Sequence, residues 1–133
     1  MRYMLDTNIC IYLIKHDPAQ VKSRYEAHPI QNLCVSAVTV AEMEYGVAKS
    51  AQPGRNGVAL QAFLAPLTVF PFDAQAAKMY GGVRAALERT GKLIGPLDLM
   101  IAAHALSLGA AVVTNNVREF ARVPGLAVEN WLE

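Results

Sequence analysis

Two aspartates of this 133-residue sequence lie within apolar segments, where a charged side chain is costly. Asp6 separates the apolar run 3–5 from the run 9–14, and Asp98 lies inside the apolar stretch 97–101. Burying a carboxylate without compensation costs several kcal/mol, on the order of the whole stability of a small domain. Each aspartate is therefore expected to cap a helix, to pair with a cation or to act in catalysis.

Further oxygen-bearing side chains follow other apolar segments that are expected to form strands. Glu42 comes after residues 33–35, and Asn116 and Glu119 come after residues 111–113. The carboxyl ends of parallel strands meet at one edge of a sheet, so these groups are expected to gather there with the aspartates. Oxygen ligands select hard cations such as Mg²⁺ or Mn²⁺, which activate water and stabilise phosphoryl charge. The pattern predicts metal-dependent hydrolysis of a phosphodiester.

Each acidic residue also has a simpler explanation. Aspartate is among the best N-cap residues, worth about 1 kcal/mol, and both Asp6 and Asp98 precede predicted helices. A cap and a metal ligand are compatible roles for one side chain. In the helix expected to begin at Val38, periodicity does not choose between Glu42 and Glu44, although Glu42 is closer to the strand end.

The elements that would position these residues alternate between short strands and helices. Strands are predicted at 3–5, 33–35, 67–70 and 111–113, with a weaker signal at 126–128. Helices are predicted at 7–15, 19–27, 38–49, 58–64 and 98–108, together with one capped by Asp73 that carries Ala76, Tyr80, Val83 and Leu87 on one face. Residues 52–57 are expected to form a turn. The alternation predicts a three-layer α/β/α fold with a mostly parallel central sheet, as one domain over residues 1–133.

The composition sets further bounds on function. Hydrophobic residues make up 53% of the chain and charged residues 17%, which suits a sheet buried on both faces. The net charge of +1 excludes a general polyanion-binding surface, so any contact with nucleic acid must use a local patch. Cys10 and Cys34 are too few for a disulfide framework or a zinc site. Without a signal-peptide pattern or an apolar stretch of about 20 residues, a cytoplasmic protein that does not bind membranes is expected.

Four motifs, in order along essentially the whole chain, resemble the PIN domain. They are Leu5-Asp6-Thr7-Asn8, Ser36-x-x-Thr39-x-x-Glu42 with Gly46, Asp98-x-x-Ile101-Ala102-x-x-Ala105, and Val113-Thr114-Asn115-Asn116-x-x-Glu119-Phe120. Trp131 also fits. Within PIN domains the chain is most similar to VapC-type toxins of bacterial toxin–antitoxin pairs. It is especially similar to a subgroup with Met-Leu-Asp-Thr-Asn-Ile-Cys near the start and Val-Thr-Asn-Asn-x-Arg-Glu-Phe near the end.

This resemblance implies an endoribonuclease that depends on Mg²⁺ or Mn²⁺. Asp6, Glu42 and Asp98 would be the catalytic, metal-binding triad, which selects the first of the two glutamates on their helix. Many members have a fourth acid where this chain has Asn116, which as a metal ligand would offer only a neutral oxygen. Glu119 could supply the missing charge. Hydrolysis by water would leave a 5′-phosphate and would not use the RNA 2′-hydroxyl as nucleophile.

The resemblance also implies substrates and partners. Candidates for orienting carboxylates or contacting phosphate are Thr7, Asn8, Ser36 and Thr114. Candidate RNA contacts, chosen near the expected site edge, are Lys49, Arg55, Arg84, Arg89, Lys92 and Arg118. Substrates in this family are structured RNAs cut in single-stranded loops, and the subgroup points to the anticodon loop of initiator tRNA. A VapB-type antitoxin, a homodimer and a larger DNA-binding hetero-oligomer are the expected partners and assemblies.

Two other classes of protein fit part of this pattern. A phosphatase of the haloacid-dehalogenase type also has an aspartate after its first strand, but it needs a second aspartate two residues on, where this chain has Asn8. The other is a non-catalytic PIN-like module that binds RNA or a protein partner. Asn116 favours that module, whereas the three retained carboxylates argue against it.

Overall fold

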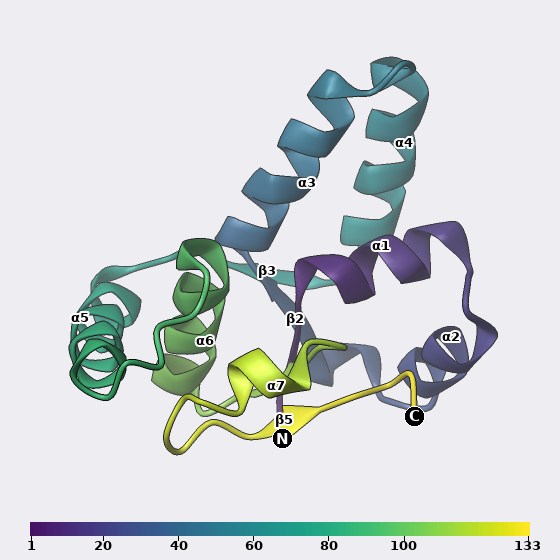
Figure 1. The fold of residues 1–133 in the computed structure, drawn as a ribbon. Coiled ribbons are helices and arrows are strands. Elements are labelled where there is room, and N and C mark those ends of the chain that lie inside the picture. Colours follow the sequence, from purple (N-terminus) through teal and green to yellow (C-terminus); the bar gives the residue numbers. More distant parts are fainter.

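A parallel sheet of five strands forms the centre of the computed structural model, which describes residues 1–133 (Figure 1). The strands are β1 (Tyr3–Leu5), β2 (Leu33–Ser36), β3 (Thr68–Phe70), β4 (Ala111–Val113) and β5 (Val128–Glu129), in the spatial order β3-β2-β1-β4-β5. In the central strand, Met4 is in register with Cys34 on one side and Val112 on the other. All neighbouring strands are parallel, which confirms the predicted sheet.

Helices cover both faces of this sheet. They are α1 (Thr7–Lys15), α2 (Ala19–Glu26), α3 (Ala37–Lys49), α4 (Pro53–Leu64), α5 (Ala74–Arg89), α6 (Pro96–Leu108) and α7 (Val117–Phe120), with a 3₁₀ turn at Ile30–Asn32. Successive strand residues face opposite ways, so Met4 packs with residues of α5 and α6, and Leu5 packs with residues of α1 and α4. The predicted three-layer α/β/α architecture is therefore confirmed.

The hairpin of α3 and α4 projects from the body of the molecule (Figure 1) and corrects one prediction. Residues 52–57 do not form a turn, because α4 begins at Pro53 and continues through them. Proline suits the first helical position, where its missing N–H has no helical partner. The connection is correspondingly short, and Asn56 Nδ2 donates to Ser50 Oγ across it at 3.0 Å. The short helix α7 was not predicted either.

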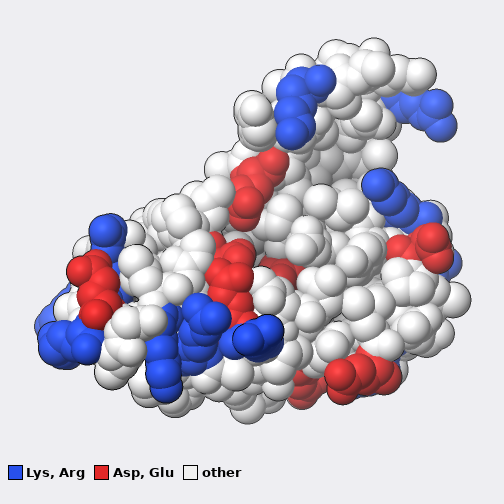
Figure 2. Space-filling view, in the orientation of Figure 1, with Lys and Arg blue, Asp and Glu red and all other residues white.

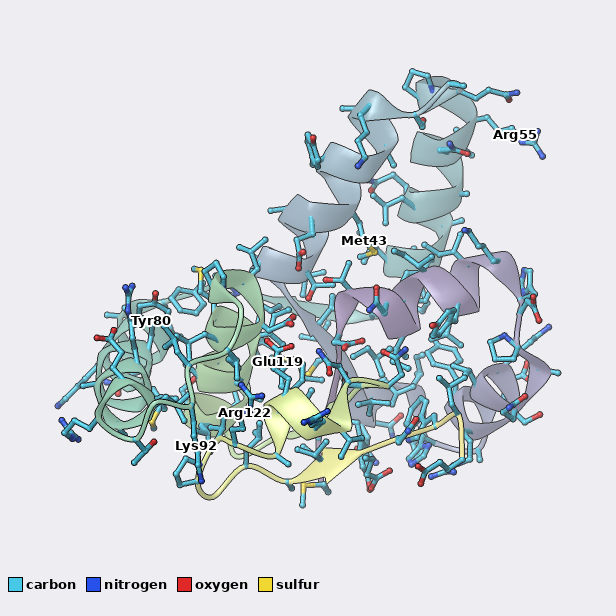
Figure 3. The ribbon with its side chains drawn as sticks, in the orientation of Figure 1. Met43, Arg55, Tyr80, Lys92, Glu119 and Arg122 are labelled. Carbon is cyan, nitrogen blue, oxygen red and sulfur yellow. The ribbon has the colours of Figure 1, made fainter.

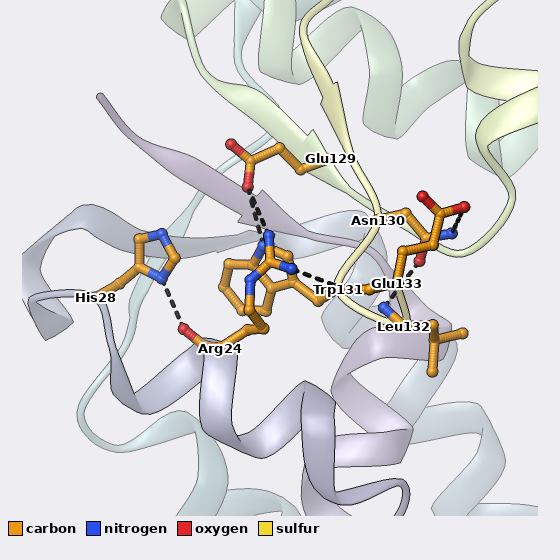
Figure 4. Close-up of polar contacts among 7 residues, drawn as sticks. All are labelled: Arg24, His28, Glu129, Asn130, Trp131, Leu132 and Glu133. Atoms are coloured by element: carbon orange, nitrogen blue, oxygen red, sulfur yellow. Dashed lines mark hydrogen bonds and ion pairs between the residues drawn. The ribbon is translucent and has the colours of Figure 1, made fainter.

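The C-terminal residues pack against α2 (Figure 4). Trp131 is fully buried, its ring stacks on His28 with 4.9 Å between centroids, and its Nε1 donates to Glu129 Oε1 at 3.0 Å. Arg24 lies 3.8 Å from the same carboxylate and donates from Nη1 to the Glu133 carbonyl at 3.1 Å. These contacts fasten the C-terminal residues to α2, and β5 itself pairs with β4 in parallel. No helix of the chain combines the length and apolar character that spanning a bilayer requires.

Candidate active site

Asp6 begins the site at the carboxyl end of β1. Its Oδ1 accepts a hydrogen bond from Ile9 N at 2.9 Å, so it caps α1, and its own N–H donates to Val113 O at 3.0 Å. The residue is only 3% exposed. Burial raises the pKa of Asp6, and the charge of Glu42 adds to the rise, while hydrogen bonds from Thr114 and Ile9 oppose it. The predicted cap is confirmed, and its carboxylate carries no cation partner.

Asp98 reaches the same edge from α6. It does not cap that helix as predicted, because α6 begins at Pro96 and Gly95 holds the cap position. Asp98 instead lies in the first turn, where the helix dipole favours a negative charge. Burial raises the pKa of Asp98 to about 6, and repulsion from Glu119, Asp6 and Glu42 contributes in that order. The fold thus brings four carboxylates close enough to influence one another.

Glu42 extends from the second turn of α3 toward α1. Thr7 Oγ1 donates to Glu42 Oε1 at 2.7 Å, a contact between residues 35 positions apart. Glu44, two residues further along the same helix, is exposed and makes no hydrogen bond to α1. The structure therefore places Glu42, and not Glu44, beside the aspartates.

Glu119 is held by two hydrogen bonds. Its Oε1 accepts from Gly95 N at 2.6 Å, and its Oε2 accepts from Asn116 Nδ2 at 2.5 Å. Asn116 N in turn donates to Thr114 Oγ1 at 2.9 Å. A side chain at Gly95 would meet Glu119 Oε1 at 3.4 Å and Asp98 Oδ2 at 3.9 Å, so both carboxylates lie over this glycine. Sequence alone did not show that Asn116 orients Glu119.

The remaining polar candidates differ in what they touch. Ser36 is buried away from solvent, accepts from Val38 N at 3.0 Å and contacts His104 Nδ1 at 2.8 Å. It thus fixes the start of α3. Thr114 is buried beside Asp6, whereas Asn8 is exposed and has no side-chain hydrogen bond in the structure.

The acidic side chains form a candidate donor set for a divalent cation. All four acidic groups present oxygen, and neither ion pair of the chain, Arg24–Glu129 or Arg84–Glu88, involves them. No three side chains are arranged around a common point in the way that an enclosed ion requires. The uncompensated charge and the oxygen-only donors nevertheless fit Mg²⁺ or Mn²⁺ chemically. Figure 2 shows red acidic side chains near the middle of the visible face.

The predicted RNA-contacting cations fall into separate groups. Lys92 and Arg118 line a pocket at the loop before α6 and at α7, next to the acidic side chains. Lys49 lies on the outer part of α3, with its ammonium 4.9 Å from the Tyr45 ring centroid. Arg55 is near the tip of the α3–α4 hairpin, well away from Glu119 (Figure 3).

Two further cations are not brought to the site. Arg84 donates to Glu88 Oε1 at 2.8 Å and to the Tyr80 hydroxyl at 3.0 Å, so its guanidinium is already occupied on the surface of α5. Arg89 is exposed at the end of the same helix. Arg122, which was not among the predicted RNA contacts, joins Lys92 in the pocket. Its spacing of four from Arg118 would have revealed it only if the helical turn at 117–120 had been foreseen.

The architecture and this acidic edge define a PIN domain. A model of the PIN domain matches residues 3–126, and the chain belongs to that family. It is 47% identical, over 98% of both chains, to the tRNA(fMet)-specific endonuclease VapC of Shigella flexneri. It is 46% identical, over 99% of both, to Ribonuclease VapC2 of Haemophilus influenzae (strain ATCC 51907 / DSM 11121 / KW20 / Rd).

Solved structures agree with this assignment. A chain in the crystal structure of DNA-bound VapBC from Salmonella typhimurium superimposes with a TM-score of 0.93, at 44% identity over 98% of both chains. A chain of VapBC2 from Rickettsia felis, bound to a promoter DNA fragment, gives a TM-score of 0.91 at 41% identity, over 98% of this chain and 99% of that one. The expected resemblance to PIN domains, and to VapC proteins among them, is confirmed.

Proposed function

We propose that this protein is the ribonuclease toxin of a VapBC-type toxin–antitoxin pair. The observation that carries the proposal is the set of uncompensated carboxylates at the carboxyl edge of the sheet, where Asp98 has its pKa raised to about 6 by burial and by Glu119, Asp6 and Glu42. The VapC relatives support it, because they match over nearly their whole length.

Asp6, Glu42 and Asp98 would hold a Mg²⁺ or Mn²⁺ ion, with Glu119 as the fourth acidic group. Such an ion supplies an activated water and offsets negative charge on the phosphate that is cleaved. The protein's own part is positional. Thr7 orients Glu42 through its 2.7 Å hydrogen bond, and Gly95 N–H, together with Asn116, orients Glu119.

The substrate proposed is a tRNA cut in its anticodon loop, in particular the initiator tRNA. The name of the Shigella flexneri relative supports this choice, because it specifies tRNA(fMet). Cleavage would take place in the cytoplasm, would inhibit translation and would leave a 5′-phosphate, since water and not the RNA 2′-hydroxyl is the nucleophile.

The proposed partner is a VapB-type antitoxin that covers the acidic edge. The solved VapBC complexes of relatives support such a partner. A larger hetero-oligomer with the antitoxin that binds DNA is proposed on the same grounds, since both complexes are bound to DNA. A homodimer of this chain is proposed in addition.

The test is cleavage of total cellular RNA by the purified protein, with RNA ends mapped by sequencing. Three samples are compared: wild type with Mg²⁺, wild type with chelator, and the Asp6→Asn variant with Mg²⁺. This variant loses the charge of residue 6 but keeps an N-cap residue for α1. Glu44→Gln is the matched control, because it removes an exposed carboxylate from the same helix as Glu42.

Discrete cuts with 5′-phosphate ends, present in wild type and Glu44→Gln and absent in the other samples, would support the proposal. A 2′,3′-cyclic end would exclude the hydrolytic mechanism. Identical RNA in every sample, with folded protein, would leave the non-catalytic RNA-binding module as the better description.

A further inference from the structure

A basic pocket lies directly beside the acidic edge. Lys92, Arg118 and Arg122 line it, together with Gly91 and Ala121, and its volume is about 520 Å³. In Figure 2 the blue side chains below the central acidic group mark this part of the surface, and Figure 3 labels Lys92 and Arg122 close to Glu119.

The backbone that carries these cations is well defined. Gly91 adopts φ +67°, in the left-handed region, and Lys92 N donates to Leu87 O at 2.9 Å, which closes the end of α5. Arg122 Nη1 donates to Leu93 O at 3.2 Å, so its guanidinium is held against the loop that leads into α6. The pocket is thus assembled from two segments that the fold brings together.

The charge of the pocket is not compensated. The ion pairs of the chain, Arg24–Glu129 and Arg84–Glu88, lie elsewhere, so none of the three pocket cations is paired with a carboxylate. Like charges grouped on a surface repel one another and raise the local concentration of anions, so a bound anion relieves the repulsion. Guanidinium groups match phosphate oxygens in a bidentate fork, and Lys supplies a further point charge.

The pocket is also continuous with the acidic residues. A second hollow, lined by Gly95, Asn116 and Glu119, shares Arg118 and Arg122 with it. A strand whose cleaved phosphate lies at the carboxylates would therefore place a neighbouring phosphate among these cations. Two adjoining sites suit a ligand that carries consecutive phosphates, such as an RNA strand. A single phosphate ion would occupy only one of them.

We propose that Lys92, Arg118 and Arg122 bind a backbone phosphate of the RNA next to the phosphate that is cleaved. This inference rests on the proposed ribonuclease function and deepens it. It selects two of the six cations expected from the sequence, adds Arg122, and excludes Arg84, whose guanidinium is held by Glu88 and Tyr80.

The first experiment measures binding of fluorescein-labelled initiator tRNA by anisotropy, in an Asp6→Asn background that keeps the RNA intact. Arg118→Ala is the main variant, because the Arg118 side chain makes no hydrogen bond within the protein and its loss should not disturb folding. Arg118→Lys keeps the positive charge but loses the bidentate hydrogen bonding of the guanidinium. Lys22→Ala, on the exposed surface of α2, removes one charge elsewhere.

Arg118→Ala is expected to weaken binding about tenfold and to lower the slope of log Kd against log salt by about 0.7 to 1 between about 50 and 200 mM salt. Arg122→Ala should behave alike. Arg118→Lys should keep the slope and lose part of the affinity, and Lys22→Ala should leave both unchanged. If Arg118→Ala, Arg122→Ala and Lys22→Ala all have the same tRNA affinity and the same salt slope, the proposed phosphate-binding role of the pocket is refuted.

The second experiment separates this proposal from the ribonuclease itself. In the otherwise wild-type protein with Mg²⁺, Arg118→Ala should raise KM about tenfold with little change in kcat, because a contact to a phosphate that does not react contributes equally to ground state and transition state. If Arg118→Ala cleaves RNA with an unchanged KM, the proposed phosphate-binding role of the pocket is refuted, while the proposed ribonuclease function is retained. Absence of cleavage by wild type would refute the nuclease, and the binding data alone would then decide on the pocket.

Discussion

Replacing Asp98 by asparagine should stabilise the metal-free protein while it abolishes cleavage. The reason is the crowding of carboxylates around Asp98, whose pKa is raised to about 6 by burial, then by Glu119, Asp6 and Glu42. Asparagine has nearly the same size and carries no charge. The functional carboxylate is therefore expected to reduce folding stability at neutral pH.

The sign and magnitude follow from the two states of the chain. The unfolded chain releases the Asp98 proton near the ordinary pKa of 3.8, and the folded protein releases it near 6. The folded state binds this proton more tightly, so the contribution is most favourable below about pH 4 and is lost as the pH rises through 6. The full difference corresponds to about 3 kcal/mol, which solvent screening of this partly exposed group reduces to about 1–2 kcal/mol.

Urea unfolding with chelator, at about pH 5 and about pH 8, measures this effect. Asp98→Asn should be more stable than wild type by about 1–2 kcal/mol at the higher pH, with a smaller difference at the lower one. Saturating Mg²⁺ should stabilise wild type and should have much less effect on the variant. A variant that is equally or less stable than wild type at about pH 8 would refute the electrostatic argument.

Three further outcomes are expected. Glu42→Gln should reduce cleavage about 100-fold, and Glu44→Gln should leave it within about twofold, in a single-turnover assay; equal effects would contradict the assignment. Trp131→Ala should lower the free energy of unfolding by about 3–5 kcal/mol in urea, because the indole is fully buried; a loss below about 1 kcal/mol would show that its site collapses. Burial lowers the pKa of His104, whose Nδ1 lies 2.8 Å from Ser36 Oγ, so its contribution to stability is complete above pH 6.5 and is lost on acidification. His104→Gln should therefore show a smaller drop in urea midpoint from about pH 7.5 to about pH 5 than wild type, and parallel curves would argue against this.

Much of the fold is determined by local pattern. Residues 7–15 form a helix as predicted, since Asp6 supplies the N-cap and buried residues recur on one face. Asp73 likewise caps α5 by accepting from Ala76 N at 3.0 Å. Capping and periodicity involve neighbours within a few positions, so they can be read without knowledge of the tertiary structure.

Helix boundaries near proline and glycine were harder to predict from the sequence. Residues 52–57 carry the residue types of a turn, yet Pro53 begins α4, and Pro96 begins α6 and so moves Asp98 from the cap into the first turn. Proline is compatible both with a turn and with the first position of a helix. Packing of the following apolar residues decides between the two.

The grouping of Asp6 and Asp98 at one edge could be predicted from residue order and type, whereas only the family resemblance selected Glu42 over Glu44, and the surroundings of these carboxylates could not be predicted. The sequence by itself determined which carboxylates follow which strands, and it predicted that their oxygens would meet at one edge of the sheet. Only the tertiary structure decided that Thr7 holds Glu42, that Asn116 turns Glu119 toward Gly95, and that Arg122 joins Lys92. The physical reason is that most of these contacts join positions far apart in the chain, and side-chain direction within them depends on how the helices pack.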